Sequence, residues 1–445
     1  MQKDPREVAV RIVSETGDTS RASYYSGISD PRDRALAYGL AAGTLKWRSL
    51  IDRHLAAFSS RSLASLRAGV LAALRVGAFQ LLFTDIPTYA AVDSVVRLQR
   101  DPRLRGFCNG VLRSVARASG HIEIPSLDKD PVSYIEARYS HPGFVAQLLV
   151  DRFGVSEALR LAARSNSPPP LSLRIARSGV LRQDYLALLR AQGHAAREGA
   201  TPSFVHLPTG SPVTLLPGFK EGLFSVQDEG AAAISAAVGP RAGDRVWDVC
   251  AAPGGKTAHL AEMLGGTGEV VATDIDSERV SMIEDTVRRL GLRGVSTAVF
   301  DATNEGASSG LGTFDRILLD APCSGLGVLR RHPDLRWNRR ESDIPAMARR
   351  QAALLRAAAP RLRSGGILVY STCTLTSEEN EGVWLPFLEE HKEFVPVDPK
   401  GRAGNFSVLY SEKLAGDGYR YILADTYDSD CFFVGCAARE ASSNA

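Results

Sequence analysis

The sequence predicts a multidomain protein with an all-α N-terminal domain, a small α/β subdomain and a C-terminal α/β domain built on a mostly parallel sheet. Three observations predict this order. Apolar residues recur at helical spacing through residues 5–117, residues 132–230 mix helix and strand signals, and short apolar strands alternate regularly with helices from about residue 231. A chain of 445 residues has room for two or three domains. We expect these domains at 1–130, 131–230 and 231–437.

The N-terminal domain is predicted to be helical throughout. In "LASLRAGVLAALRVGAFQLL" an apolar residue recurs every three or four positions, which predicts an amphipathic helix with a single apolar stripe. The stripe consists of Leu63, Leu66, Val70, Leu74, Ala78 and Leu81. Pro31, Pro87 and Pro102 fall between such segments and are expected to break the helices. The polar stretch 118–131 is predicted to be a linker.

The middle region carries fewer signals. "FVAQLLVDRFG" and "EALRLAARSN" predict helices that end at "SPPP", whereas "LSLRI" predicts a short strand and "QDYLALLRAQG" a further helix. These elements are too few for a doubly wound sheet, so a small α/β subdomain is expected.

The C-terminal region alternates strands and helices. Strands are predicted at 245–249, 269–273, 295–300, 314–320 and 366–372, each separated from the next by a longer segment that is mostly helical in pattern. Such alternation predicts right-handed crossovers and a mostly parallel sheet. The loops that follow the strands should therefore meet at one edge of the sheet, where ligands bind in open α/β folds.

The composition limits the classes of function. Six cysteines in a chain of this length do not make a disulfide framework, and no Cys/His cluster has zinc spacing, so a reducing cytoplasm and no metal site are expected. No apolar run is long enough for a transmembrane helix, and the N-terminus does not look like a signal peptide. Residues 1–130 hold 19 Lys/Arg against 13 Asp/Glu, while the remainder holds 34 against 37. A basic N-terminal part fits either contact with phosphates or a solvated surface.

The loop after the first C-terminal strand, "CAAPGGKT", is a candidate nucleotide site. Its small residues let the backbone approach a ligand, and the helix that it opens offers free N–H groups. Asp274 ends the second strand at the offset of a ribose-binding acid, and Asp301 follows the third strand, where an adenine amino group could lie. A Walker A loop fails because Cys250 stands where its first glycine is needed, and the dinucleotide G-x-G-x-x-G is missing. S-adenosylmethionine fits best.

Two thiols follow the next two strands. "LLDAPCSG" supplies Asp320 and Cys323, and "VYSTCT" supplies Cys373. A lone cysteine is most often a small buried residue, but two on adjacent loops beside an acid favour chemistry. A thiolate that adds to C6 of a pyrimidine makes C5 nucleophilic, and a nearby acid stabilises the adduct. A methyl donor, two thiols and an acid therefore suit methylation of C5.

The motifs "DVCAAPGGKT", "DAPCSGLGVLRRHPD" and "YSTCTLTSEEN" resemble the signatures of the RNA cytosine-C5 methyltransferases of the Nol1/Nop2/Sun family. The N-terminal "RDRALAYGLAAGTLKWR" and "FCNGVLR" are similar to the NusB-like RNA-binding domain of the bacterial Sun (RsmB-type) branch. The resemblance covers most of the chain. It implies a NusB-like helical domain, a small RNA-binding subdomain and a Rossmann-like S-adenosylmethionine-dependent methyltransferase domain.

The resemblance also implies roles for individual residues. It makes Cys373 the nucleophile and Cys323 the residue that assists product release, the reverse of DNA cytosine methyltransferases. It places Asp320 against the cytosine ring and Lys256 in the active site. The cofactor contacts that it implies are Cys250, Ala251, Ala252, Pro253, Gly254, Gly255, Lys256, Asp274, Asp301 and Asp320.

Three further features bear on this interpretation. "LRRHPDLRWNRR" at 329–340 holds five arginines, which we expect to bind phosphates of RNA rather than to form only a solvated loop. Cys431 stands where the family usually has Gly, and Cys108 stands where Val is common. We interpret both as small-volume replacements.

The predicted function is therefore methylation of cytosine C5 in 16S (small-subunit) ribosomal RNA through a covalent cysteine–C6 adduct. The expected partner is ribosomal RNA, free or in early small-subunit assembly, with no membrane and no DNA. Two alternatives stay open: a tRNA cytosine-C5 methyltransferase, and a non-catalytic ribosome assembly factor with a relic methyltransferase domain. A nicotinamide-dependent oxidoreductase is disfavoured by the missing dinucleotide motif.

Overall fold

The computed structural model describes residues 3–118, 122–176, 180–304, 310–424 and 427–440. The chain forms two compact units. One consists of Met1–Pro168 with Leu329–Arg340, and the other of Pro169–Val328 with Glu341–Ala445. Each is described separately. Among the helices built from these residues, none has the length and apolar character needed to cross a membrane.

The first unit is helical. Its helices are α1 (Pro5–Glu15), α2 (Pro31–Lys46), α3 (Arg48–Phe58), α4 (Ala68–Phe83), α5 (Thr88–Arg97), α6 (Pro102–Arg117), α7 (Pro131–Tyr139), α8 (Gly143–Asn166) and α14 (Leu335–Asn338). The prolines start helices as well as separating them. Pro31 and Pro102 occupy the first turns of α2 and α6, and the side chain of the preceding aspartate accepts a backbone N–H in each case. Residues 119–121 of the predicted linker lie outside the described residues.

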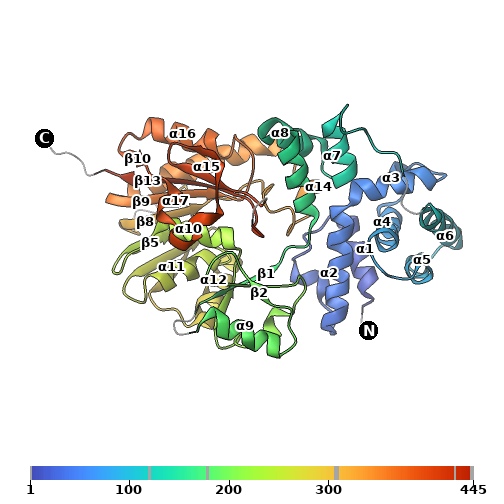
Figure 1. The fold of residues 1–445 in the computed structure, drawn as a ribbon, viewed down its shortest axis with the longest axis horizontal. Coiled ribbons are helices and arrows are strands. Elements are labelled where there is room, and N and C mark those ends of the chain that lie inside the picture. Colours follow the sequence, from blue (N-terminus) through green and yellow to red (C-terminus); the bar gives the residue numbers. More distant parts are fainter. Residues whose placement is uncertain (1–2, 119–121, 177–179, 305–309, 425–426, 441–445) are drawn as a thin grey trace. The chain divides into compact units, whose positions relative to one another are not determined.

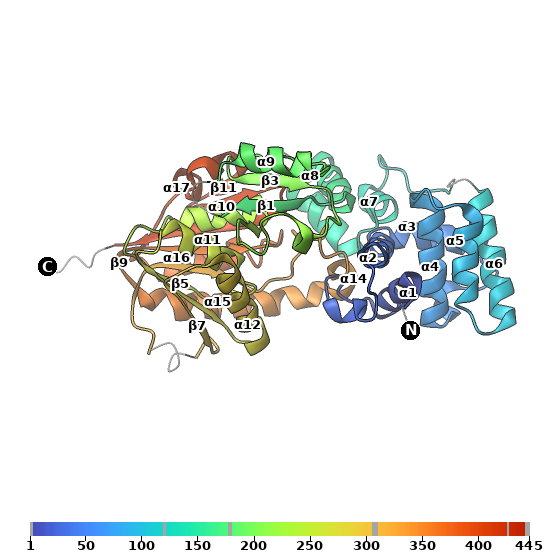
Figure 2. The same cartoon turned by 90° about the horizontal axis from the view of Figure 1, so that it is seen from below.

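Helix α4 lies at the centre of this unit, in contact with α1, α2, α3, α5 and α6. Figure 2 shows α4, α5 and α6 side by side. The predicted single apolar stripe is wrong in two respects. The helix begins only at Ala68, after Leu63 and Leu66, and its residues from Ala72 to Gln80 are all buried. A helix covered on every side needs no polar face, so its apolar residues do not mark one direction.

The arginine-rich segment 329–340 completes this helical unit. Arg336 is fully buried, and its guanidinium donates a hydrogen bond to Ser165 Oγ. It also donates to the backbone carbonyls of Lys46, Tyr139, Ser140 and Ser165. Arg330 is 2% exposed and donates to the Pro168 carbonyl at 2.9 Å. The expectation that these arginines bind phosphate is therefore wrong for Arg330 and Arg336, because both side chains are buried and their terminal nitrogens donate to protein carbonyls.

The second unit begins with a small antiparallel sheet in the order β2-β3-β1-β4. Its strands are β1 (Leu171–Ile175), β2 (Arg197–Glu198), β3 (Phe204–Leu207) and β4 (Phe224–Val226), with α9 (Arg182–Ala191) between β1 and β2. Leu173, Leu186, Leu189, Val205 and Phe224 form the apolar core of this sheet and helix. The strand predicted at "LSLRI" is confirmed as β1.

The larger sheet has the strand order β11-β12-β13-β9-β8-β5-β6-β7, and β10 pairs with β13. Its strands are β5 (Arg245–Asp248), β6 (Glu269–Asp274), β7 (Val295–Val299), β8 (Phe314–Asp320), β9 (Leu362–Thr372), β10 (Phe394–Pro396), β11 (Tyr410–Gly416), β12 (Tyr419–Ile422) and β13 (Phe432–Arg439). The five predicted strands, β5 to β9, form the parallel half. Strands β10 to β13 pair antiparallel, so the sheet is mixed rather than mostly parallel.

Among the described residues, the helices that accompany this sheet (Figure 1) are α10 (Glu229–Val238), α11 (Gly255–Met263), α12 (Ser277–Leu290), α15 (Ile344–Ala358), α16 (Glu381–Glu390) and α17 (Pro399–Arg402). Helix α11 contacts both α10 and α12, whereas α15 packs on α16. Because β5 to β9 run parallel, the loops that follow them emerge at the same edge of the sheet. That edge carries every predicted site residue.

Candidate active site

The loop after β5 passes close to neighbouring backbone. Gly254 has a φ of +99°, and a Cβ there would lie 3.0 Å from Ile283 Cα, so a side chain would not fit. Gly255 begins α11, and the first N–H groups of that helix have no intrahelical partner. A loop of mostly small residues at a helix N-terminus suits an electronegative ligand, as the sequence predicts.

Asp248 ends β5 directly beneath this loop, and the sequence reasoning did not single it out. The residue is fully buried, its Oδ2 accepts a hydrogen bond from Thr257 Oγ1 at 2.7 Å, and its Oδ1 has no partner. Burial raises the pKa of Asp248 to about 7. An acid at the end of an apolar strand was the available signal.

Asp274 and Asp301 lie at the ends of the next two strands. Asp274 is buried, and its carboxylate faces the Ala252 N–H at 3.4 Å and the guanidinium of Arg279 at 3.4 Å. Asp301 is exposed, and the Thr303 hydroxyl and N–H, which donate to its Oδ1, lower its pKa. Phe300 N–H donates to the Asp274 carbonyl, which keeps these two strand ends adjacent.

Lys256 and Asp320 form an ion pair at the same edge. Lys256 Nζ lies 2.6 Å from Asp320 Oδ2, and Ser371 Oγ donates to Asp320 Oδ1 at 2.7 Å. Burial alone would lower the pKa of Lys256, but the adjacent Asp320 carboxylate outweighs it and the net pKa is raised. Lys256 is therefore an ammonium at neutral pH, with Asp320 held between two donors.

The two predicted thiols meet. Cys323 Sγ and Cys373 Sγ are 3.2 Å apart, although the residues follow different strands, β8 and β9. Cys373 also lies close enough to Lys256 for charge on its sulfur to raise the pKa of the lysine. The structure thus brings together Lys256, Asp320, Cys323 and Cys373.

The surroundings of Cys323 disfavour its thiolate form. The hydrogen bond with Cys373, together with burial, raises the pKa of the Cys323 thiol well above its usual range. The Glu379 carboxylate acts in the same direction. Cys323 is therefore a protonated thiol at neutral pH and a poor initial nucleophile.

Gly327 holds the ends of three segments together. Its N–H donates to the Cys373 carbonyl at 2.9 Å, and its carbonyl accepts from the Cys431 N–H at 3.1 Å. A Cβ on Gly327 would lie 2.4 Å from the Cys431 oxygen. Cys431 is buried beside β13, and Cys108 is buried in α6, which agrees with their interpretation as small-volume residues.

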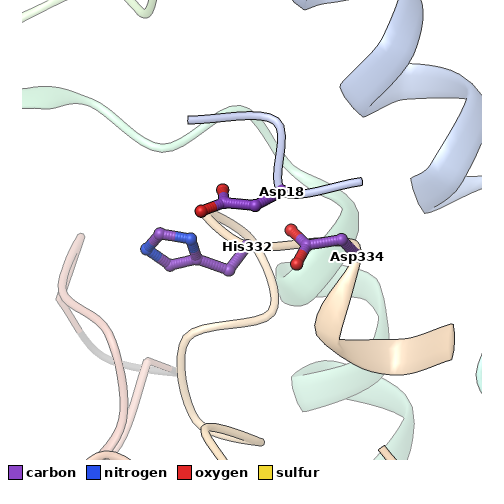
Figure 3. A group of neighbouring side chains, drawn as sticks. All are labelled: Asp18, His332 and Asp334. Carbon is purple, nitrogen blue, oxygen red and sulfur yellow. The ribbon is translucent and has the colours of Figure 1, made fainter. Parts of the chain in front are cut away.

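One group in the described residues has the make-up of a cation site, and it belongs to the helical unit. Asp18, His332 and Asp334 place their ligand atoms within 4.8 Å of one another (Figure 3). Asp334 is 4% exposed and its Oδ1 has no hydrogen-bond partner, whereas Asp18 already accepts two bonds from Ser20. The sequence expects no metal site, and a group assembled from distant segments leaves no spacing pattern that could reveal it.

Comparison with known families identifies each part of the chain. The family model "16S rRNA methyltransferase RsmB/F" matches residues 235–436, the NusB family matches residues 3–117, and the ferredoxin-like domain of RsmF/B-like methyltransferases matches residues 141–214. The chain is 37% identical over 434 residues to "Ribosomal RNA small subunit methyltransferase B" of Escherichia fergusonii. That alignment covers 94% of this chain and 98% of the relative.

Solved structures share the fold. The structure titled PH0851 superposes with a TM-score of 0.78 at 24% identity and covers 99% of this chain and 100% of its own. NSun6 from Pyrococcus horikoshii, solved with SFG, gives 0.57 at 22% identity and covers 68% and 99%. The resemblance seen in the motifs is confirmed, and the chain belongs to the RsmB/F family of 16S rRNA methyltransferases.

Proposed function

We propose that this protein methylates carbon 5 of a cytosine in 16S ribosomal RNA, acting in the cytoplasm on free RNA or on an early small-subunit particle. The relative from Escherichia fergusonii is named for the small-subunit RNA, which supports this substrate. The observation that carries the proposal is the 3.2 Å approach of Cys323 and Cys373 beside the Lys256–Asp320 pair.

S-adenosylmethionine is the cofactor of this methyltransferase, and it supplies an electrophilic methyl group when bound. The residues fit it. The loop from Cys250 to Lys256 would hold its polar end against the start of α11, and the buried Asp274 carboxylate would accept the ribose hydroxyls. Asp301 would reach the adenine amino group. These contacts are the proposed cofactor site.

Cys373 is the proposed nucleophile. Its sulfur bonds to C6 of the cytosine, and the displaced electron pair makes C5 nucleophilic. The Lys256 ammonium is the donor in its hydrogen bond with Asp320. This pair therefore holds the proton that is shared with N3 of the ring as the adduct forms. Cys323 remains a thiol through this step because its pKa is raised.

Cys323 then serves the release step. A base, for which solvent water suffices, takes the C5 proton. The C5–H electron pair then forms the C5=C6 double bond, and Cys373 leaves as a thiolate with the electron pair of its bond to C6. Cys323 is next to the departing sulfur and is the group placed to exchange a proton there. The two cysteines thus divide addition and release between them.

Bisulfite sequencing of total RNA from cells with and without the gene tests the substrate. We expect one 16S cytosine to lose methylation, to regain it with the wild-type gene, and to remain unmethylated with Cys373→Ala. If methylation were lost only from a tRNA cytosine, the substrate would be tRNA rather than 16S RNA. If calorimetry found no S-adenosylmethionine binding and no site changed, the relic alternative would replace the enzyme.

A further inference from the structure

Glu379 is a fully buried carboxylate on the loop that carries Cys373, and it is hydrogen-bonded to the loop that carries Cys323. It lies in the segment after β9, just before α16. Its oxygens accept four hydrogen bonds. Oε1 accepts from Ser324 N–H at 2.8 Å and from Gln351 Nε2 at 2.9 Å, whereas Oε2 accepts from Ser324 Oγ and from Thr376 Oγ1.

This network joins the residues that directly follow each cysteine. Ser324 follows Cys323, Thr374 follows Cys373, and their hydroxyl oxygens are 2.6 Å apart. Gln351 on α15 also donates to the Pro322 carbonyl at 2.9 Å, on the other side of Cys323. The carboxylate therefore holds the backbone of the Cys323 loop directly and is joined to its own loop by the Thr376 hydroxyl. The Ser324–Thr374 hydroxyl pair is a second link between the two loops.

A carboxylate suits this network better than an amide does. An ionised carboxyl is acceptor-only and can satisfy four donors, whereas an amide offers one oxygen. All four donors here are neutral, so a negative charge is buried among dipoles, at a cost in folding free energy. A buried network whose members are hydrogen-bonded in this way fixes one arrangement of the groups around it.

We propose that Glu379 is a positioning residue for methyl transfer: its carboxylate fixes the relative placement of the Cys323 and Cys373 loops, so that both thiols can act on one cytosine. This inference rests on the proposed function of the two thiols. Glu379 makes no hydrogen bond given above to the sulfur of Cys373 or to the Lys256–Asp320 pair. It acts on the two loops through their backbone and hydroxyl groups, and its charge also raises the pKa of Cys323.

Three variants and a matched control test the proposal. Glu379→Ala removes the carboxylate and its four hydrogen bonds. Ser324→Ala removes the hydroxyl that contacts both Glu379 and Thr374, while the Ser324 N–H bond to Glu379 is kept. Glu379→Gln keeps the Oε1 acceptor, and the two hydroxyls can rotate to accept from its amide. The adjacent Glu378 is exposed, so Glu378→Ala is the control.

Steady-state methylation of the RNA substrate should separate these variants. We expect kcat to fall about a hundredfold in Glu379→Ala and about tenfold in Ser324→Ala, with KM for RNA and affinity for S-adenosylmethionine within about threefold of wild type. Glu379→Gln should restore kcat to within about tenfold, and Glu378→Ala should match wild type. In a Cys323→Ala background, Glu379→Ala should also lower the yield of covalent protein–RNA adduct about tenfold.

Two results would overturn the inference. One is a Glu379→Ala enzyme with wild-type kcat. The other is a loss that appears only in KM for RNA, with adduct yield unchanged. If Glu379→Ala does not fold, Ser324→Ala and Glu379→Gln decide, and wild-type kcat in both contradicts the proposal. The proposed function fails separately, if Cys373→Ala still methylates.

Discussion

The sheet edge and segment 329–340 both carry residues that the sequence predicts to be functional, yet these residues have different surroundings in the structure. At the edge, Lys256, Asp320 and the two cysteines face one another. In the segment, Arg336 is enclosed by carbonyls of its own helical unit. One set of charged residues is available for chemistry, and the other holds the fold.

The difference lies in what determines the neighbours of each residue. Parallel strands bring their following loops to one edge, so the topology alone predicts that Asp320 and Cys373 meet. An arginine in a loop has no such constraint, and backbone carbonyls from any segment can satisfy it. Clustered arginines therefore indicate RNA contact only when their donors are exposed.

The edge is tested most strongly at Lys256. Lys256→Met should lower kcat about a thousandfold, because the variant lacks the ammonium that we propose shares a proton with the cytosine ring. Single-turnover methylation with saturating cofactor measures this, and exposed Lys392→Met is the matched control. If kcat of Lys256→Met were within tenfold of wild type, Lys256 would have no essential role in the reaction.

Asp248 tests whether a buried carboxyl at the sheet edge makes the free energy of unfolding depend on pH. Its raised pKa means that the folded state binds the proton more tightly than the unfolded state, so its contribution to stability is present below about pH 4 and is lost as pH rises to about 7. Asp248→Asn should therefore unfold at similar urea to wild type at pH 4 and be more stable by about 4 kcal/mol at pH 8. Equal stability at both pH values would contradict the burial of a charge here.

Arg336 tests the other side of the comparison. Arg336→Met should destabilise the protein by about 3 kcal/mol, since several buried carbonyls lose their donor. Arg53→Ala, at an exposed position of α3 in the same helical unit, should change stability by less than about 0.5 kcal/mol. Thermal unfolding measures both. Unchanged stability with weakened RNA binding in Arg336→Met would restore the phosphate-binding expectation and end the contrast.

Gly327 gives the smallest expected effect. Gly327→Ala places a Cβ against the Cys431 and Cys373 carbonyls, which should displace the thiol loops slightly and lower kcat about thirtyfold. Gly401→Ala, where a Cβ meets nothing within 4 Å, is the control. Wild-type activity in Gly327→Ala would mean that the loops tolerate a shift.

Local patterns predicted the strands of the parallel half well. Strand β8 matches its predicted range at both ends, because an apolar run bounded by polar residues leaves little choice. Strands β11 and β12 escaped prediction because β11 is mostly exposed and β12 has only four residues. Asp248 and Glu379 were missed for a different reason: their importance lies in tertiary partners, which a single sequence does not state.

The central claim is that Cys373 forms the bond to RNA and Cys323 releases it. Denaturing electrophoresis of each variant after incubation with substrate RNA and S-adenosylmethionine tests it directly. We predict a shifted protein–RNA band for Cys323→Ala and no such band for Cys373→Ala or for the double variant. A band that persists in Cys373→Ala and disappears in Cys323→Ala would reverse the two roles and contradict the account.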